Sequence, residues 1–221
     1  MTEKSKEKNI VEYKAVIIGN PDSGKTLFFK KARMGFLNDK NISTIGIDKC
    51  TLYFTNQEIK INDTIRKEDF NIILYDTAGQ ERFRALTKNY FNSTDIFIIL
   101  YNINSRSSFE SVELWIKNIK ENLSDIKTEK YLLALIGNNV VNIDEEEQKR
   151  EVEEEEAKSF CEKYGIYWAG ECSLKDSSEK EVNELIINIW KKYVEKFGIK
   201  SAKIKLEPIL IKKYKKKNNC Q

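Results

Sequence analysis

The segment from 19 to 26 reads GNPDSGKT, in which two glycines, Lys25 and Thr26 match the pattern G-x-x-x-x-G-K-[ST]. Such glycines let backbone N–H groups curl around an anion, the lysine can reach the β and γ phosphates of a nucleotide, and the threonine hydroxyl can bind Mg²⁺. Because the motif follows an apolar run, the sequence predicts a phosphate-binding loop here. The residues expected to contact the phosphates are Asp22, Ser23, Gly24, Lys25, Thr26 and Leu27.

A second motif, DTAGQERF at 76–83, directly follows another apolar run. An Asp at a strand end that faces a phosphate loop can hold Mg²⁺ through water. The Gly79 N–H can sense a γ phosphate, and Gln80 can orient the attacking water. We therefore predict Thr26 and Asp76 as magnesium ligands, Gly79 as a phosphate contact and Gln80 as the catalytic residue.

Alternating strands and helices must position these motifs. Helical periodicity over Phe109–Leu123 and Val182–Phe197 follows two predicted capping boxes, Ser107-x-x-Glu110 and Ser178-x-x-Glu181. The alternation predicts a three-layer α/β fold with a mostly parallel six-stranded sheet, about five helices, and the ligand site at the carboxyl ends of the strands. The apolar runs predicted as strands are 11–18, 51–54, 70–75, 96–101, 131–136 and 167–172.

Two polar stretches interrupt this plan. Residues 55–69 are expected to form a long hairpin connection, and residues 144–156 are strongly acidic. For both we favour a solvated loop or helix surface over a surface that docks a partner. The predicted organisation is an N-terminal extension at 1–10, one domain at 11–198, and a basic flexible tail at 199–221.

The composition excludes some kinds of catalytic and metal-binding site. The chain has no His, which excludes His-based triads and His metal sites. Cys50, Cys161 and Cys172 have no metal or disulfide spacing and are expected to be buried thiols in a reducing compartment. No run of about 18 apolar residues occurs and the N-terminus is charged, so a cytosolic protein is expected. Residues 196–221 hold nine Lys and one Glu, a net +8 that leaves −5 for residues 1–195.

The motifs together resemble a Rab-type small GTPase of the Ras superfamily, from about Tyr13 to Phe197. STIGID at 43–48 resembles the Rab switch I, and DTAGQERFRALTKNYF at 76–91 resembles switch II. The resemblance implies a P-loop GTPase G domain that binds GTP or GDP with Mg²⁺ as cofactor. It also implies that Thr44 contacts both Mg²⁺ and the γ phosphate.

The base site follows from the same resemblance. ECSLK at 171–175 resembles the ETSAK guanine loop, which implies that Ser173 and Leu174 shape the base site and that Lys175 lies beside the ring. Lys49 stands where Rab proteins usually have Phe, and Tyr75 where they usually have Trp, so unusual partners are expected. The connection at 55–69 also looks about ten residues longer than the tight hairpin of the family.

GNNVVN at 137–142 departs from the guanine motif G-N-K-x-D. The alignment implies that Asn138 is the base-binding Asn, while Asn139 replaces the Lys and Val141 replaces the Asp. The Asp of the family accepts hydrogen bonds from the guanine N1–H and exocyclic amine, and valine can accept neither. Each lost bond costs about 1–3 kcal/mol in a closed site.

Three interpretations of this departure stay open. In the first, Val141 is in register and the protein binds GTP weakly or with little base preference. In the second, the loop slips by one residue, so that Asn139 and Asn142 take the site and xanthine fits better than guanine. In the third, Asp144 folds back into the site.

The resemblance implies a switch that cycles between GTP and GDP, hydrolyses GTP and regulates vesicle traffic. The alternative is a pseudo-GTPase that serves as a binding module. Effectors, an exchange factor and a GTPase-activating protein are expected to bind residues 40–50 and 76–91. No nucleic acid partner is expected, and the chain is expected to be monomeric.

The basic tail and a lipid on Cys220 would hold the protein on the cytosolic face of endomembranes, whereas an unmodified solvated tail is the alternative. Cys220 is not in a C-a-a-X position.

Overall fold

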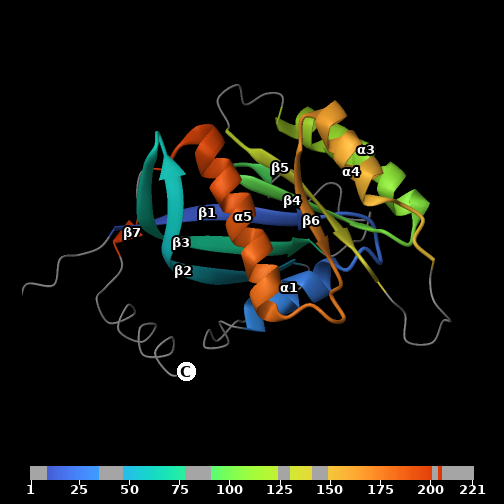
Figure 1. Ribbon diagram of the computed structural model, residues 1–221, viewed down its shortest axis with the longest axis horizontal. Coiled ribbons are helices and arrows are strands. Elements are labelled where there is room, and N and C mark those ends of the chain that lie inside the picture. The colour runs from blue at the N-terminus through green and yellow to red at the C-terminus, as the bar shows by residue number, and fades with distance from the viewer. Residues whose placement is uncertain are drawn as a thin grey trace, which may run out of the picture.

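The computed structural model describes residues 9–34, 47–77, 91–123, 130–140, 149–200 and 204–205. These residues form one sheet with helices packed on both faces (Figure 1). The strands are β1 (Asn9–Ile18), β2 (Ile47–Ile61), β3 (Thr64–Thr77), β4 (Ile96–Asn102), β5 (Leu132–Asn138), β6 (Tyr167–Cys172) and β7 (Ile204–Lys205). The helices are α1 (Lys25–Met34), α3 (Arg106–Leu123), α4 (Glu154–Tyr164) and α5 (Glu179–Phe197).

The main sheet has the strand order β2-β3-β1-β4-β5-β6. All neighbours are parallel except β2 and β3, which are antiparallel. The central strands β4 and β5 are buried almost throughout, as expected where helices cover both faces of a parallel sheet. This arrangement confirms the predicted three-layer α/β class. Within the described residues there are four helices, against the expected five or so.

Alternate residues of β1 divide the core into two clusters. Tyr13, Ala15 and Ile17 pack with the apolar faces of α1 and α5. Val16 and Ile18 point the other way and pack with α3 and α4. In Figure 1, α1 and α5 accordingly lie together on one side of the sheet and α3 and α4 on the other. The central strand is therefore fixed from both faces, and its carboxyl end leads directly into the phosphate loop.

One of the two predicted capping boxes is confirmed. The Ser178 hydroxyl accepts from the Glu181 N–H, and the Glu181 carboxylate accepts from the Ser178 N–H, at the start of α5. The predicted box at Ser107 is wrong, because α3 already begins at Arg106. The Ser105 hydroxyl instead accepts from the N–H of Ser108 at 3.3 Å, so the cap lies two residues earlier.

The expectation of a solvated loop at 55–69 is also wrong. Strand β2 continues to Ile61 and β3 starts at Thr64, so the connection is a two-residue turn. Asn62 and Asp63 both have positive φ, 46° and 61°, as a type I′ turn requires. An alternation of apolar and polar residues explains why the β2–β3 hairpin extends this far. Ile59 is buried against the core, while its polar neighbours face solvent.

Contacts with the folded domain continue past residue 198 in the described part of the chain. Lys200 forms an ion pair of 2.7 Å with Asp95, whose carboxylate also accepts from the Tyr193 hydroxyl. Further on, β7 pairs antiparallel with the first residues of β1. The predicted domain limits at 11 and 198 stay predictions, and these contacts lie outside them.

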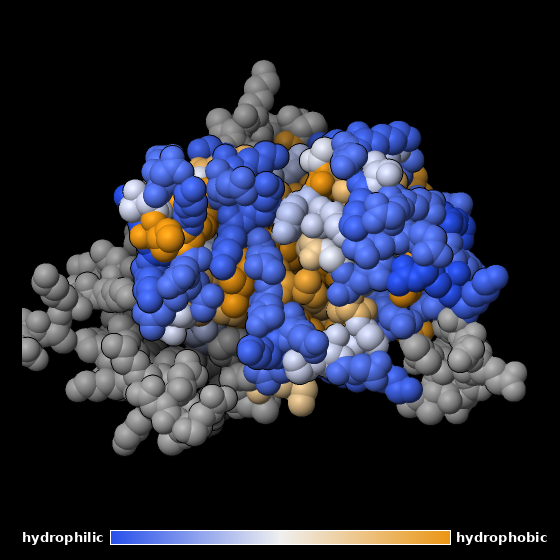
Figure 2. All heavy atoms as spheres, viewed as in Figure 1, coloured by the Kyte–Doolittle hydropathy of each residue, from blue (hydrophilic) through white to orange (hydrophobic). Residues whose placement is uncertain are grey.

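The exposed side chains seen in Figure 2 agree with this packing. Figure 2 shows a hydrophilic band along the outer side of α5, with apolar side chains visible beside it. None of the described helices combines the length and apolar character needed to cross a bilayer. Cys50, Cys161 and Cys172 are buried free thiols, as predicted. Burial raises the pKa of Cys161 and of Cys172 to about 12.

Candidate functional site: a phosphate end and a base end

The predicted motifs meet at one edge of the sheet. Strands β1, β3, β5 and β6 run parallel, so their carboxyl ends lie on the same side. Asp76 pairs in register with Ile17, two residues before the phosphate loop, and Asn138 pairs with Cys172. The sheet therefore brings together segments that are more than 150 residues apart in the chain.

Two glycines of the phosphate loop are required by close backbone approach. At Gly19, where φ is 142°, an added Cβ would lie 2.2 Å from the Leu100 carbonyl oxygen. At Gly24, where φ is 89°, it would lie 2.1 Å from the Asn138 amide nitrogen. Any larger residue at either position would displace the loop from the sheet. The second glycine also leaves the space through which Asn138 reaches the loop.

Lys25 is buried at the start of α1, with a relative exposure of 5%. Its ammonium group donates to the Asn20 carbonyl oxygen. Burial lowers the pKa of Lys25 to about 8, although the charges of Asp76 and Asp22 act in the opposite direction. A buried lysine held by its own loop is ready to bind an anion, because a phosphate would restore the partner that water no longer supplies.

Asp76 lies beside Lys25 and Thr26 at the end of β3. It is 4% exposed, and burial raises its pKa, while a hydrogen bond from the Thr26 side chain and the Lys25 charge oppose the rise. Its Oδ1 atom is buried and has no hydrogen-bond partner among the described residues. An orphaned carboxylate oxygen next to a hydroxyl provides the oxygen donors that Mg²⁺ prefers. These residues therefore fit a magnesium ion bound together with phosphate.

Asn138 connects the phosphate end to the base end. Its amide nitrogen donates to the Ser23 carbonyl oxygen at 3.0 Å, and its amide oxygen accepts from the Leu174 N–H at 3.3 Å. The side chain is 1% exposed, so both bonds are shielded from water. One residue thus fixes the phosphate loop and the loop after β6 relative to each other.

The loop after β6 carries the other predicted base contacts. Leu174 is buried, Ser173 is half-buried and donates to Asp176 at 2.8 Å, and Lys175 is exposed. Lys31 of α1 donates to the carbonyl oxygens of Lys175 and Ser177. Sequence reasoning missed Lys31, because no local motif marks a contact across 146 residues.

Next to Asn138, the residue that replaces the usual lysine is also held in place. The Asn139 N–H donates to the Cys172 carbonyl oxygen at 2.8 Å. Its side-chain oxygen is buried without a partner among the described residues. The base end therefore contains an unused acceptor where the Rab pattern has a cation.

Several predicted site residues lie outside the described residues, and their roles stay predictions. They are Thr44, Gly79, Gln80, Val141, Asn142, Asp144 and Cys220. The structure brings together Asp22, Ser23, Gly24, Lys25, Thr26, Leu27, Asp76, Asn138, Ser173, Leu174 and Lys175. Of these, Leu27 is 44% exposed at the outer side of α1.

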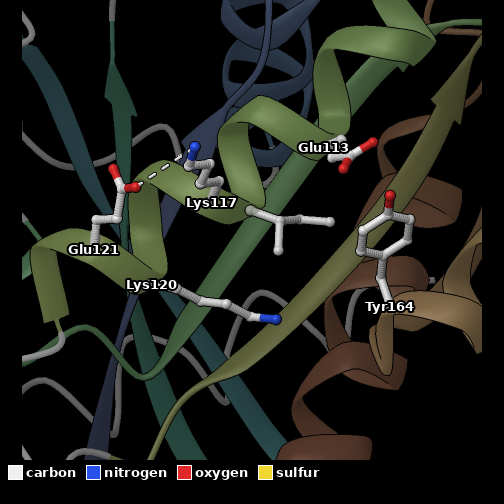
Figure 3. Close-up of a pocket in the computed structure, with 6 residues that line it drawn as sticks. Glu113, Lys117, Lys120, Glu121 and Tyr164 are labelled. Carbon is white, nitrogen blue, oxygen red and sulfur yellow. Dashed lines mark ion pairs between the residues drawn. The ribbon is translucent and has the colours of Figure 1, made fainter.

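Two hollows lie away from this edge. One, of about 510 Å³, lies between α3 and α4 and is shown in Figure 3 with Glu113, Lys117, Lys120, Glu121 and Tyr164. The ion pair drawn there, Lys117–Glu121 at 3.9 Å, joins two residues of α3 one turn apart. The other lies between α5 and β2. Neither lies at the carboxyl ends of the strands, so neither belongs to the candidate site.

Comparison with known proteins agrees with this geometry. The sequence matches the model of the Ras family over residues 14–195. It is 31% identical to human Ras-related protein Rab-30 over 169 residues, which cover 76% of this chain and 74% of the relative. It is 31% identical to rat Ras-related protein Rab-19 over 182 residues, covering 82% and 75%. It is 34% identical to Rab-19 of Xenopus laevis over 166 residues, covering 75% and 70%.

Proposed function

Because the chain belongs to the Rab-type small GTPases of the Ras superfamily, we propose that it is a switch that cycles between GTP and GDP and hydrolyses GTP. Its proposed role is the regulation of intracellular vesicle traffic. The observation that carries the proposal is the buried pair of Lys25 and Asp76, in which the lysine and one carboxylate oxygen are available to a ligand. A structural ion pair with no ligand would instead satisfy its own atoms.

The residues have distinct proposed roles. Lys25 and the backbone N–H groups of residues 22–27 bind the phosphates, and Thr26, Thr44 and Asp76 hold Mg²⁺. When bound, Mg²⁺ neutralises charge on the β and γ phosphates. Gln80 orients a water whose oxygen bonds to the γ phosphorus while the bond to the β–γ bridging oxygen breaks, leaving GDP and phosphate. The Gly79 N–H senses the γ phosphate, so that residues 40–48 and 76–91 respond to it.

Proposed partners bind next to this site, on residues 40–50 and 76–91. Lys49 belongs to that surface and Tyr75 directly precedes its second segment, and these two unusual residues lie opposite each other on β2 and β3. Lys14 lies 5.4 Å from the centre of the Tyr75 ring. The substitutions therefore form one patch with added positive charge. This patch supports the proposal that effectors, exchange factor and activating protein differ from those that prefer an aromatic pair.

The proposed membrane attachment rests on the sequence of the tail. Each lysine near an anionic leaflet contributes about 1 kcal/mol, and one lipid chain on Cys220 would complete a two-signal anchor. We propose a peripheral position on the cytosolic face of endomembranes. Mass spectrometry of the protein made in a eukaryotic cell tests this, because an unshifted C-terminal peptide would remove the lipid from the proposal.

The proposed nucleotide preference is tested by identifying the nucleotide that the purified protein carries. Nucleotide released from fresh protein is identified by chromatography, and GDP, ADP and XDP are then titrated with Mg²⁺. We expect stoichiometric GDP with micromolar or tighter affinity, and phosphate release from GTP that is lost in Gln80→Leu. Absence of both bound nucleotide and Mg²⁺-dependent binding would reject the switch.

The second candidate is a pseudo-GTPase that serves as a binding module. The observation in its favour is Val141, which leaves guanine without its usual acceptor if the register set by Asn138 continues into the loop. In that case the titrations would give equal, weak affinities for GDP, ADP and XDP, with no phosphate release from GTP.

A further inference from the structure

Asn20, the second residue of the phosphate loop, is bound by a helix outside the loop. Its amide nitrogen donates to the Ser111 hydroxyl at 2.9 Å, and its amide oxygen accepts from the Trp115 indole N–H at 3.0 Å. Both partners lie on α3, one turn apart. Sequence reasoning did not find them, because they are 91 and 95 residues away from Asn20.

The chemistry of the partners fixes the orientation of the amide. The Ser111 hydroxyl donates its hydrogen to the Ser107 carbonyl oxygen at 2.7 Å, so it can only accept from Asn20. The Trp115 indole can only donate. The amide nitrogen must therefore face Ser111 and the amide oxygen must face Trp115. A rotated amide would lose both bonds.

The backbone of the same residue holds the phosphate-binding lysine. The Asn20 carbonyl oxygen accepts from the Lys25 ammonium group, and also from the Ser23 N–H at 3.3 Å. Because Pro21 follows, Asn20 is restricted to extended conformations, which leaves the carbonyl little freedom once the side chain is held. Loss of the hydrogen bonds between α3 and Asn20 should therefore alter the position of the Lys25 ammonium group.

We propose that Ser111 and Trp115 are positioning residues for nucleotide binding, which act through Asn20 to hold Lys25 where the phosphates bind. This inference rests on the proposed function, because it concerns the same nucleotide. Asn138, which serves the base end, bonds to Ser23 and Leu174 and not to Asn20. Loss of the α3 contacts should therefore weaken binding of the phosphates without changing the preference for a base.

The test compares full-length Trp115→Phe and Ser111→Ala with Trp168→Phe. Trp168 is the matched control, because it packs against the same apolar cluster as Trp115 and donates to Glu154, far from the loop. The measurement is the dissociation rate of fluorescently labelled GDP in excess Mg²⁺, together with the affinities for GDP and XDP. We expect Trp115→Phe and Ser111→Ala to release GDP roughly tenfold faster, from the loss of one hydrogen bond each. Affinity for GDP and XDP should fall by the same factor.

Tryptophan emission provides a second readout, which a general loss of stability would not mimic. Release of GDP by a chelator should change the emission of the wild-type protein and of Trp168→Phe. In Trp115→Phe most of that change should disappear. Melting temperatures of the nucleotide-free variants report separately on folding.

Two results would overturn the inference alone: wild-type protein that binds GDP while both α3 variants release it at the wild-type rate, or unequal losses of GDP and XDP affinity. Wild-type protein that binds no nucleotide would reject the proposed function and this inference with it. If Trp115→Phe fails to fold, the decision rests on Ser111→Ala, which removes a single oxygen atom.

Discussion

The phosphate end and the base end of the site differ in how completely they match the Rab pattern. At the phosphate end the two glycines, Lys25, Thr26 and Asp76 are all present and brought together by β1, β3 and α1. At the base end Asn138 is anchored, but Asn139 replaces a lysine and its buried side-chain oxygen has no described partner. Val141 stands where an acidic residue is expected.

Because of this difference, the affinity for a nucleotide and the selectivity for its base depend on different ends of the site. Phosphate contacts are common to all nucleotides, so an intact phosphate end supplies binding energy without discriminating between bases. Selection of guanine depends on acceptors that a competing base leaves unpaired. The protein can therefore retain a nucleotide switch while its choice of base is relaxed or altered. Variants at each end of the site test whether affinity and selectivity are separated in this way.

The largest effect is expected at the phosphate end. Lys25→Ala removes the buried ammonium group that is proposed to pair with the phosphates, and truncating one partner of a buried charge pair costs about 2–5 kcal/mol of binding free energy. GDP affinity should fall by about 30- to 4000-fold, with GDP, ADP and XDP affected alike. Isothermal titration measures the affinities. The control is Lys180→Ala, a lysine of α5 whose side chain is 86% exposed, which should change affinity less than about twofold. Equal losses in both variants would argue against a specific phosphate contact.

The next effect is expected at the base end. Val141→Asp restores an acceptor for two guanine donors, each worth about 1–3 kcal/mol, so GDP should bind about 100-fold more tightly. XDP and ADP should gain little, and competition titrations measure the ratios. Val140→Asp adds the same charge one residue earlier and should not reproduce the gain. An unchanged GDP affinity would reject the first interpretation of the loop and favour the slipped or folded-back register.

A smaller effect should appear at the residue that joins the two ends. Asn138→Ala leaves the Leu174 N–H and the Ser23 carbonyl oxygen buried without partners, which costs about 1–3 kcal/mol. The melting temperature should fall by about 2–10 °C. Asn122→Ala is the control, because the Asn122 amide nitrogen donates to the carbonyl and side-chain oxygens of Asn118, one turn earlier in α3. A melting temperature equal to that of the control would show that the two ends are held together by other contacts.

The smallest effect is a dependence on pH. Since the pKa of Lys25 is lowered to about 8 in the free protein, against 10.5 ordinarily, the unfolded chain binds more protons between these values. The free energy of unfolding of the nucleotide-free protein should therefore rise with pH in this window. Bound phosphate raises the pKa of Lys25, so GDP binding takes up a proton there.

GDP affinity should accordingly weaken by up to about tenfold for each pH unit above 8. Titrations between pH 7 and 10 measure the slope. Lys25→Arg keeps its charge over this range and should give a flat profile. A slope that persists in Lys25→Arg would assign the titration to another group.

Much of the fold followed from short patterns. The six strands of the main sheet were predicted, because buried parallel strands are continuously apolar and β4 and β5 are such runs. The extent of β2 and β3 was not predicted, since residues 55–69 are polar and alternate only around Ile59 and Ile61. The cap of α3 was misplaced because Ser105 and Ser107 are both acceptable cap residues, and only the packed helix selects between them.

By itself the sequence determined the phosphate-loop motif, Asp76 as a candidate magnesium ligand and the departure from the guanine motif, because each depends on residue types at fixed local spacing. Only the tertiary structure decided which distant side chains hold these motifs. Asn138 reaches Ser23 and Leu174, Lys31 reaches the loop after β6, and Trp115 reaches Asn20. These bonds join residues 36 to 146 positions apart, and their geometry arises from the packing of helices on the sheet, which no local spacing encodes.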